Sequence, residues 1–282
     1  SACNNSPHLC SRSYGNITHL GAHDSPFVSN EANKFNIGGN QFWNSTIQLD
    51  AGVRLLSGQV HPSPSEGPSV LRVCHTSCAI YDGGLLTDWL ASISRWLDRN
   101  ANEVVTLLLV NGGGIEATIL DSAYKNSGIA KYTFTPSFTS APVLSSWPDL
   151  NSFVSSNKRL ITFVDSLPSG NTGASYLLPE FSYIFENAYE ITSPTGFTCA
   201  PARPPTISTT AQAQSSNMMF LQNHFLGTAL GAGIVIPNMN ASSNTNGPDA
   251  NVTGSLGAAA KECQMIYNKA PNFLLVDWFD HG

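Results

Sequence analysis

VVTLLLV, the segment from Val104 to Val110, carries an apolar side chain at every position except Thr106. Successive side chains of a strand point to opposite faces, so a strand of this composition must be covered on both sides. Such strands are typical of parallel sheets whose two faces are covered by helices. Hydrophobic residues at helical spacing on both flanks, at about Leu85–Leu97 and Ile115–Asn126, agree with this interpretation and predict an α/β fold.

Seven further short apolar segments are predicted strands, and most are separated by segments with helical spacing. They are Ile17–Ala22, Val53–Val60, Leu71–Cys74, Leu160–Val164, Tyr183–Phe185, Met218–Leu221 and Phe273–Val276. Eight strands with intervening helices predict a single (β/α)8 TIM-barrel domain over residues 1–282. The second and third strands are joined by only about ten residues, three of them proline, which is too short for a parallel crossover. We therefore expect a distorted barrel that lacks at least one helix.

A short helix is expected at Asp149–Ser156, and a further helix at about Leu256–Asn268. Two segments with little apolar periodicity, about Ser193–Ser216 and Asn238–Gly254, are rich in Pro, Asn, Gly and Ser. Such composition is typical of surface loops, so we expect two long loops on the barrel.

The composition excludes several classes of partner. Charged residues make up 11% of the chain, against roughly 25% in an average soluble protein. The net charge is −6 and the 13 Lys and Arg residues form no cluster, which argues against a nucleic-acid partner and against a strongly basic membrane-binding face. No apolar run is long enough to span a membrane. No signal peptide is present in the sequence, and we expect that one has been removed.

Cysteines and glycosylation sequons indicate an oxidising compartment. The six cysteines suggest the pairs Cys3/Cys10, Cys74/Cys78 and Cys199/Cys263, although the sequence alone allows fifteen connectivities. The spacings do not match common zinc ligand sets, so zinc binding is the weaker interpretation. Five Asn-x-Ser/Thr sequons are present, at Asn4, Asn16, Asn44, Asn240 and Asn251. We expect a secreted or cell-surface glycoprotein.

Polar side chains follow every predicted strand, at the end where a barrel of this type forms its active site. In chain order they are His23 and Asp24, Gln59 and His61, His75, Asn111, Asp165, Glu186 and Asn187, Asn223 and His224, and Asp277. Four of the seven histidines are in this set, which a general preference of polar residues for loops does not explain. A Cys74–Cys78 disulfide would hold the loop that carries His75, although a loop disulfide with an incidental histidine remains the alternative.

Three of these segments resemble phosphatidylinositol-specific phospholipase C X-type domains. Gly21–Ser25 (GAHDS) resembles the G-x-H-(D/N)-S segment that closes their first strand, and Gly52–Leu56 (GVRLL) resembles the G-(I/V)-R start of their second. Phe273–Asp277 (FLLVD) resembles their closing strand, and His75 falls where the family places its second catalytic histidine. The resemblance extends from about residue 16 to 279, and the chain is similar in particular to secreted fungal members of the family.

The resemblance implies a catalytic set of two histidines and two aspartates. His23 would be the general base that activates an inositol 2-hydroxyl, and His75 the general acid that protonates the leaving alkoxide. Asp277 would orient His23, and Asp24 would do the same for His75. Either aspartate could instead be a helix or loop cap.

The chain departs from the family on the second strand. Bacterial members place an aspartate and an arginine where this chain has Ser57 and Gln59, and calcium-dependent members place carboxylates there and at Asn111. A positioned cation normally stabilises the charge of such a transition state. His61, His224 or an external metal on Asp24, Asp277 or Asp165 could replace it, but we expect no metal and no cofactor. The remaining candidates for substrate binding are Gln59, His61, Asn111, Asp165, Glu186, Asn223 and His224.

These observations favour a phosphodiesterase of the phosphorus–oxygen lyase type. We expect it to act on an inositol phospholipid, a glycosylphosphatidylinositol or a polyol phosphate, as a monomer that can contact a membrane peripherally. A barrel that binds a polyol or glycan without turnover is one alternative, motivated by the uncharged Ser57 and Gln59. Hydrolysis of a glycosidic or sphingolipid bond is another, motivated by Asp165 and Glu186.

Overall fold

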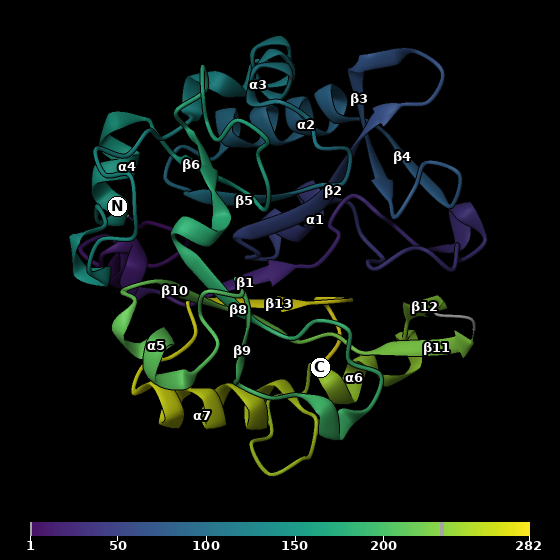
Figure 1. The fold of residues 1–282 in the computed structure, drawn as a ribbon, viewed down its shortest axis with the longest axis vertical. Coiled ribbons are helices and arrows are strands. Elements are labelled where there is room, and N and C mark those ends of the chain that lie inside the picture. Colours follow the sequence, from purple (N-terminus) through teal and green to yellow (C-terminus); the bar gives the residue numbers. More distant parts are fainter. Residues whose placement is uncertain (1, 232–233) are drawn as a thin grey trace.

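A computed structural model describes residues 2–231 and 234–282 and contains a curled sheet with helices around it (Figure 1). Eight strands of this sheet run parallel to their neighbours. They are β1 (His19–Ala22), β2 (Leu55–Ser63), β5 (Val105–Asn111), β6 (Leu160–Val164), β7 (Leu177–Pro179), β8 (Ile184–Asn187), β10 (Met219–Asn223) and β13 (Phe273–Val276). The last strand pairs with the first, so the sheet follows the strand order of a barrel. Within the described residues β7 and β8 are not paired, and the barrel is open there.

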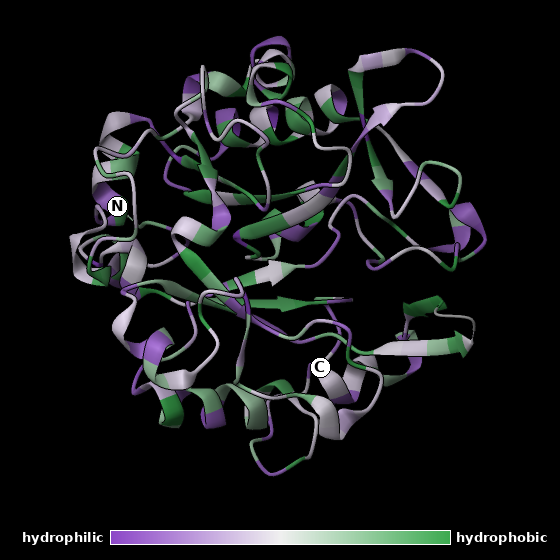
Figure 2. Ribbon diagram, viewed as in Figure 1, coloured by the Kyte–Doolittle hydropathy of each residue, from purple (hydrophilic) through white to green (hydrophobic). Residues whose placement is uncertain are grey.

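The helices lie outside the sheet, as the doubly apolar strands require (Figure 1). They are α1 (Ser45–Asp50), α2 (Leu86–Arg99), α3 (Ala117–Asn126), α4 (Leu150–Ser156), α5 (Thr210–Ser215), α6 (Ser242–Thr245) and α7 (Leu256–Tyr267). Helix α2 buries one stripe of apolar residues, including Trp89, Ile93 and Trp96, in the core that also contains β2 and β5. Figure 2 shows hydrophobic residues along the barrel strands and a mixture of hydrophilic and hydrophobic residues on the helices. The predicted α/β barrel is confirmed.

One predicted barrel strand is wrong. Leu71–Cys74 belongs to β3 (Gly67–His75), which pairs antiparallel with β2 and with β4 (Tyr81–Leu85). The connection between β2 and β3 is therefore a hairpin and needs no crossover helix, which explains why the loop is so short. The strand missing from the prediction is β7, which has only three residues, too few to form a recognisable apolar pattern.

The two segments expected to be loops contain some regular structure. The first contains β9 (Pro201–Arg203), which pairs antiparallel with β8, and helix α5. The second contains the short helix α6. A separate hairpin of β11 (Gly227–Gly231) and β12 (Ile234–Pro237), which the sequence did not predict, extends away from the barrel (Figure 1).

The three expected disulfides are present, Cys3–Cys10, Cys74–Cys78 and Cys199–Cys263. The second connects the end of β3 to the loop that follows it, and the third connects the segment after β8 to α7. Within the described residues, none of the helices has the length and apolar character needed to cross a membrane.

Candidate active site

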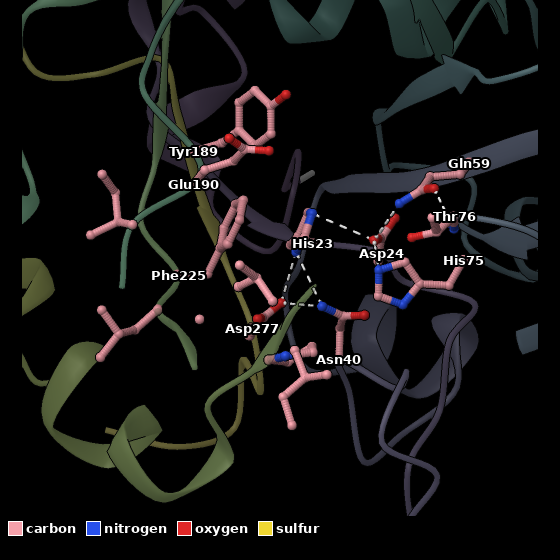
Figure 3. A pocket seen from close by; sticks show the side chains of 16 residues that line it. His23, Asp24, Asn40, Gln59, His75, Thr76, Tyr189, Glu190, Phe225 and Asp277 are labelled. Carbon is pink, nitrogen blue, oxygen red and sulfur yellow. Dashed lines mark hydrogen bonds and ion pairs between the residues drawn. The ribbon is translucent and has the colours of Figure 1, made fainter. Parts of the chain in front are cut away.

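The carboxyl ends of β1, β2 and β13 meet the loop after β3 at a cavity of about 220 Å³ (Figure 3). His23, Asp24, Gln59, His75 and Asp277 all line it. The opposite wall is formed by the segment after β8, by Phe225, and by the hairpin β11–β12. One wall of the cavity thus carries imidazole, carboxylate and amide groups, and the opposite wall is largely apolar.

His23 follows β1 and is fixed from several sides. Its Nδ1 lies 2.8 Å from Asp277 Oδ1, and Asn40 Nδ2 donates to the same oxygen at 3.0 Å. The ring of Phe225 stacks on the imidazole, with 3.7 Å between ring centroids. Because a carboxylate only accepts hydrogen bonds, His23 Nδ1 carries a proton, and the neutral imidazole presents the lone pair of Nε2 to the cavity. The side chain is 21% exposed, so a ligand can reach it.

His75 is the last residue of β3 and faces His23 across the cavity. Its Nδ1 donates to the backbone carbonyl of Gly38, and its ring stacks parallel to that of Phe27, 5.2 Å away. Nε2 therefore faces the cavity, and the side chain is 16% exposed. The Cys74–Cys78 disulfide holds the turn that follows His75, as the sequence suggested.

Asp24 lies between the two imidazoles. Its Oδ2 is 3.5 Å from His23 Nε2 and 3.4 Å from His75 Nε2, and it accepts a hydrogen bond from Gln59 Nε2 at 3.0 Å. The backbone of Asp24 is left-handed, with φ of 48°, and its N–H donates to Ser57 Oγ. An aspartate in this strained conformation is expected where the surrounding structure requires a particular side-chain position. One carboxylate oxygen thus contacts both rings.

The charges around His23 determine its pKa. Burial by itself lowers the pKa of His23, but the negative charges of Asp24 and Asp277, the hydrogen bond to Asp277 and the charge of Glu186 together raise it above 6.5. Gln59 connects this network to the His75 loop, because its Oε1 accepts from the backbone N–H of Thr76 at 2.8 Å. The uncharged residue at position 59 therefore positions Asp24 but brings no positive charge.

Two histidines expected in the site lie elsewhere. The imidazole of His61 lies against Gly112, and its burial lowers the pKa. His224 is fully buried, and its Nε2 lies 3.0 Å from the carbonyl oxygen of Thr245. Burial lowers the pKa of His224 to about 4, so it is neutral at physiological pH. Neither residue lines the cavity, and neither supplies the positive charge for which it was considered.

The other candidates for substrate binding form hydrogen bonds around the cavity rather than in it. Asn111 holds the turn before α3 by bonding to the backbone of Ile115, and Asp165 Oδ1 accepts from the Asn111 N–H. Glu186 pairs with Arg203 and accepts from Asn223 Nδ2 at 3.2 Å. Only Gln59 of that set lines the cavity.

Several cavity residues were not identified from the sequence. Asn40 lies in an irregular segment between β1 and α1, where no periodicity marks a functional position. The same segment contains Gly38, whose carbonyl accepts from His75 Nδ1. Phe225 follows directly on Asn223 and His224, so the neighbouring polar residues were the only signal for it. Tyr189 and Glu190, above Phe225 in Figure 3, follow β8 in the same way.

Comparison with known proteins gives one consistent result. The PI-PLC X family model ("PI-PLC X 1") matches residues 9–282. A "PI-PLC X domain-containing protein 1" of Arthroderma benhamiae is 38% identical over 281 residues, which cover 99% of this chain and 86% of that protein. An "Uncharacterized secreted protein" of the same fungus is 35% identical over 285 residues, covering 99% of this chain and 60% of that protein.

Solved structures show the shared fold. A phosphatidylinositol-specific phospholipase C from Listeria monocytogenes matches with a TM-score of 0.64 and 15% identity, over 98% of this chain and 92% of the other. One from Staphylococcus aureus matches with a TM-score of 0.61 and 14% identity, over 95% and 88%. The family match over residues 9–282 and the relative that is 38% identical establish that the chain belongs to the PI-PLC X domain family.

Proposed function

We propose that this protein is a phosphodiesterase of the phosphorus–oxygen lyase type that cleaves an inositol phospholipid or a glycosylphosphatidylinositol. The observation that carries the proposal is the arrangement of two imidazoles across one cavity. Both Nε2 atoms lie within 3.5 Å of the same Asp24 oxygen, and both rings are partly accessible to solvent. A small phosphodiester bound there would contact one imidazole on each side.

The proposed reaction transfers one proton at each imidazole. His23 Nε2 takes the proton of the inositol 2-hydroxyl, whose oxygen then forms a bond to phosphorus. The bond between phosphorus and the lipid oxygen breaks, and His75 Nε2 gives its proton to that oxygen. The products are an inositol cyclic phosphate and a lipid alcohol. Each positioned proton transfer contributes on the order of 10² to 10⁴ in rate.

The product distinguishes this reaction from other hydrolyses. Phosphatidylinositol vesicles incubated with the protein across pH 4 to 8 should yield inositol cyclic phosphate, detected by ³¹P NMR. Absence of any cyclic phosphate with inositol phospholipids and glycosylphosphatidylinositols would refute the proposal. The alternative of glycosidic hydrolysis is no longer supported, because Asp165 and Glu186 lie outside the cavity and bond to Asn111 and Arg203.

Exposed apolar side chains on two sides of the cavity support a substrate held in a membrane. On one side they belong to the hairpin β11–β12, which is hydrophobic toward its tip in Figure 2, with Leu230 57% and Ile234 56% exposed. On the other side are Ile37, 67% exposed and next to the Gly38 that bonds His75, and Ile80, 55% exposed and in contact range of Gly38. Exposed apolar groups around a site are typical of contact with a membrane or another protein.

Replacing Leu230 and Ile234 together with serine should weaken binding to phosphatidylinositol vesicles by at least about 10-fold. A 10-fold change corresponds to about 1.4 kcal/mol, and complete burial of each such side chain contributes roughly 1.5–3 kcal/mol, so partial burial of the two is sufficient. The measurement is vesicle sedimentation, with cleavage of a short-chain monomeric substrate as a second readout that should change less. Met265→Ser, a change at an exposed residue of α7, is the matched control. Equal losses on vesicles and on the monomeric substrate would contradict a membrane-contact role for the hairpin.

The pH dependence of cleavage should report the raised pKa of His23. A general base must be neutral, so kcat/KM falls as the pH drops below the pKa, and the midpoint of the acidic limb should lie above 6.5. Asp277→Asn removes one of the charges that raise this pKa, so the midpoint should move to lower pH while the rate also falls. Asp98→Asn, at a surface ion pair, is the control and should leave the midpoint in place. An unshifted midpoint in Asp277→Asn would contradict the assigned role.

An extracellular location is part of the same proposal. It is supported by the three disulfides, which are typical of oxidising compartments, and by a relative described as secreted. We also propose N-glycans on the four sequon asparagines that are exposed, Asn16, Asn44, Asn240 and Asn251. Asn4 is unsuited, because its Nδ2 is buried and its Oδ1 accepts from the Val104 N–H.

A further inference from the structure

A second cavity, of about 350 Å³, lies between the start of α1, strand β4 and the first two turns of α2. It shares no lining residue with the catalytic cavity. Trp89 and Pro26 contribute apolar surface to it, while Asp88 and Ser92 contribute a carboxylate and a hydroxyl. Apolar surface with a few polar groups at fixed positions is typical of sites for small organic ligands.

Two consecutive glycines, Gly83 and Gly84, keep the β4 side of this cavity open. A Cβ atom added at Gly84 would have no heavy atom within 4 Å, so the space beside it is not filled by neighbouring side chains. The φ of Gly84 is 96°, a conformation that other residues rarely adopt. This side of the cavity therefore presents backbone groups, which bond well to a ligand with many hydroxyl groups because hydroxyls both donate and accept.

Asn44 lines the same cavity and is exposed, so it lies at the edge. It is the acceptor asparagine of the sequon Asn44–Thr46. Its Oδ1 accepts from the backbone N–H groups of Thr46 and Ile47, whereas its Nδ2 makes no hydrogen bond with any residue in the described part of the chain. An N-glycan replaces one hydrogen of Nδ2 and leaves Oδ1 free to accept. The cap of α1 and a glycan are therefore compatible at Asn44.

The cavity also lies where three parts of the chain meet. Trp89 Nε1 in α2 donates to Ser45 Oγ in α1 at 2.8 Å, and Pro26 belongs to the segment after β1, two residues beyond Asp24. A sugar ring held in the cavity would contact all three parts at once. Because a ligand that binds only the folded state stabilises it, such a sugar should raise the stability of this side of the barrel.

We propose that this cavity is a carbohydrate site occupied by the protein's own N-glycan, whose first N-acetylglucosamine is linked to Asn44. Nδ2 forms a bond to C1 of the sugar, the bond from C1 to the diphosphate of a lipid-linked oligosaccharide donor breaks, and the proton lost from Nδ2 leaves with the diphosphate. The sugar ring covers Trp89, and its polar groups bond to Asp88 and Ser92. This inference rests on the proposed glycosylation of Asn44 and not on the proposed phosphodiesterase activity.

The melting temperature tests whether the glycan stabilises the fold. The protein secreted by a yeast should melt about 2–4 °C higher than the same chain made in the bacterial periplasm, which forms disulfides but adds no such glycan. Trimming with an endoglycosidase that leaves only the first N-acetylglucosamine should preserve this shift. Thr46→Ala removes the sequon and keeps Asn44, so the shift should disappear, whereas Thr46→Ser keeps the sequon and should retain it. Each variant is compared with its own bacterial form, which cancels effects of the substitution itself.

The matched control is Thr253→Ala, which removes the sequon at Asn251. Asn251 also lines a cavity, but its Nδ2 already donates to Asp249 Oδ1 at 3.1 Å, and a glycan there gains no such free group. The shift should therefore be unchanged in Thr253→Ala. A shift that persists in Thr46→Ala, or that is lost when the glycan is trimmed to one sugar, overturns the inference.

Hydrogen exchange followed by mass spectrometry locates the sugar. Strand β4 and the first turn of α2 should exchange about 5-fold more slowly in the trimmed glycoprotein than in the bacterial form. Ser92→Phe fills the cavity but leaves the sequon, so it should still be glycosylated and should lose both this protection and the melting shift. An unmodified Asn44, or a modified Asn44 without protection of β4, contradicts the proposal. Cyclic phosphate formation is measured separately, so a failure of the proposed lyase activity leaves this result unaffected.

Discussion

Alanine at His23 or at His75 is expected to reduce formation of inositol cyclic phosphate by a factor on the order of 10² to 10⁴, the largest losses of activity for any single substitution in this protein. Each change removes one of the two proton transfers, and neither ring has a neighbour that can replace it, since His61 and His224 lie outside the cavity. Loss of both should cost less than the product of the single losses, because the two groups act in one step. The measurement is single-turnover cleavage of phosphatidylinositol.

The separate roles of the two histidines can be distinguished with the leaving group. A substrate whose leaving group is a nitrophenolate does not need a proton from His75, so it should restore much of the activity of His75→Ala and little of that of His23→Ala. His8→Ala, at an exposed histidine near the amino terminus, is the matched control and should behave as the unchanged protein. Equal rescue of both catalytic variants would show that the assignment of base and acid is wrong.

The strands could be predicted from the sequence where side-chain packing alone determines the apolar pattern. VVTLLLV corresponds to β5, and seven of the eight predicted strands overlap a parallel strand of the barrel. The alternation of Leu71–Cys74 could not reveal its direction, because a hairpin strand with one buried face has the same pattern as a barrel strand. The direction is set by the hairpin connection to β2, a feature of the turn and not of side-chain periodicity.

The site could be predicted as far as its residues follow directly on strands of the barrel. His23, Asp24 and Asp277 lie where strand ends place them, and Gln59 lies on the barrel part of β2. His61 shares a face with Gln59, but β2 continues past the barrel to pair with β3, so its ring is carried out to Gly112. Asn40 comes from an irregular segment, and only the folded chain brings it to His23.

Arg54, the arginine of the GVRLL segment, lies away from the residues that we propose to be catalytic. Arg54 precedes β2 and lies at the end of the barrel opposite to the cavity. Its Nε donates to Glu103 Oε2 at 2.9 Å, and its Nη1 donates to the backbone carbonyls of Leu49 and Val53. Arg54 is 4% exposed and Glu103 7%, so both charges are buried and each depends on the other.

Removing one partner of this pair should therefore cost far more than losing a surface contact. We expect Arg54→Met or Glu103→Gln to lower the free energy of unfolding by about 3–5 kcal/mol, because each leaves a buried charge without a partner. The double variant Arg54→Met/Glu103→Gln should lose less than the sum of the two single losses, since it leaves no unpaired charge. The measurement is urea denaturation followed by circular dichroism.

The matched control is Asp98→Asn at the exposed ion pair with Lys131, which should change the free energy of unfolding by less than about 1 kcal/mol. The folded fraction of each variant should retain its rate of cyclic phosphate formation, because Arg54 touches no residue of the catalytic cavity. Additive losses in the double variant would mean that the two charges do not stabilise one another. A loss of turnover without a loss of stability would instead indicate that Arg54 takes part in the reaction and not in stabilising the barrel.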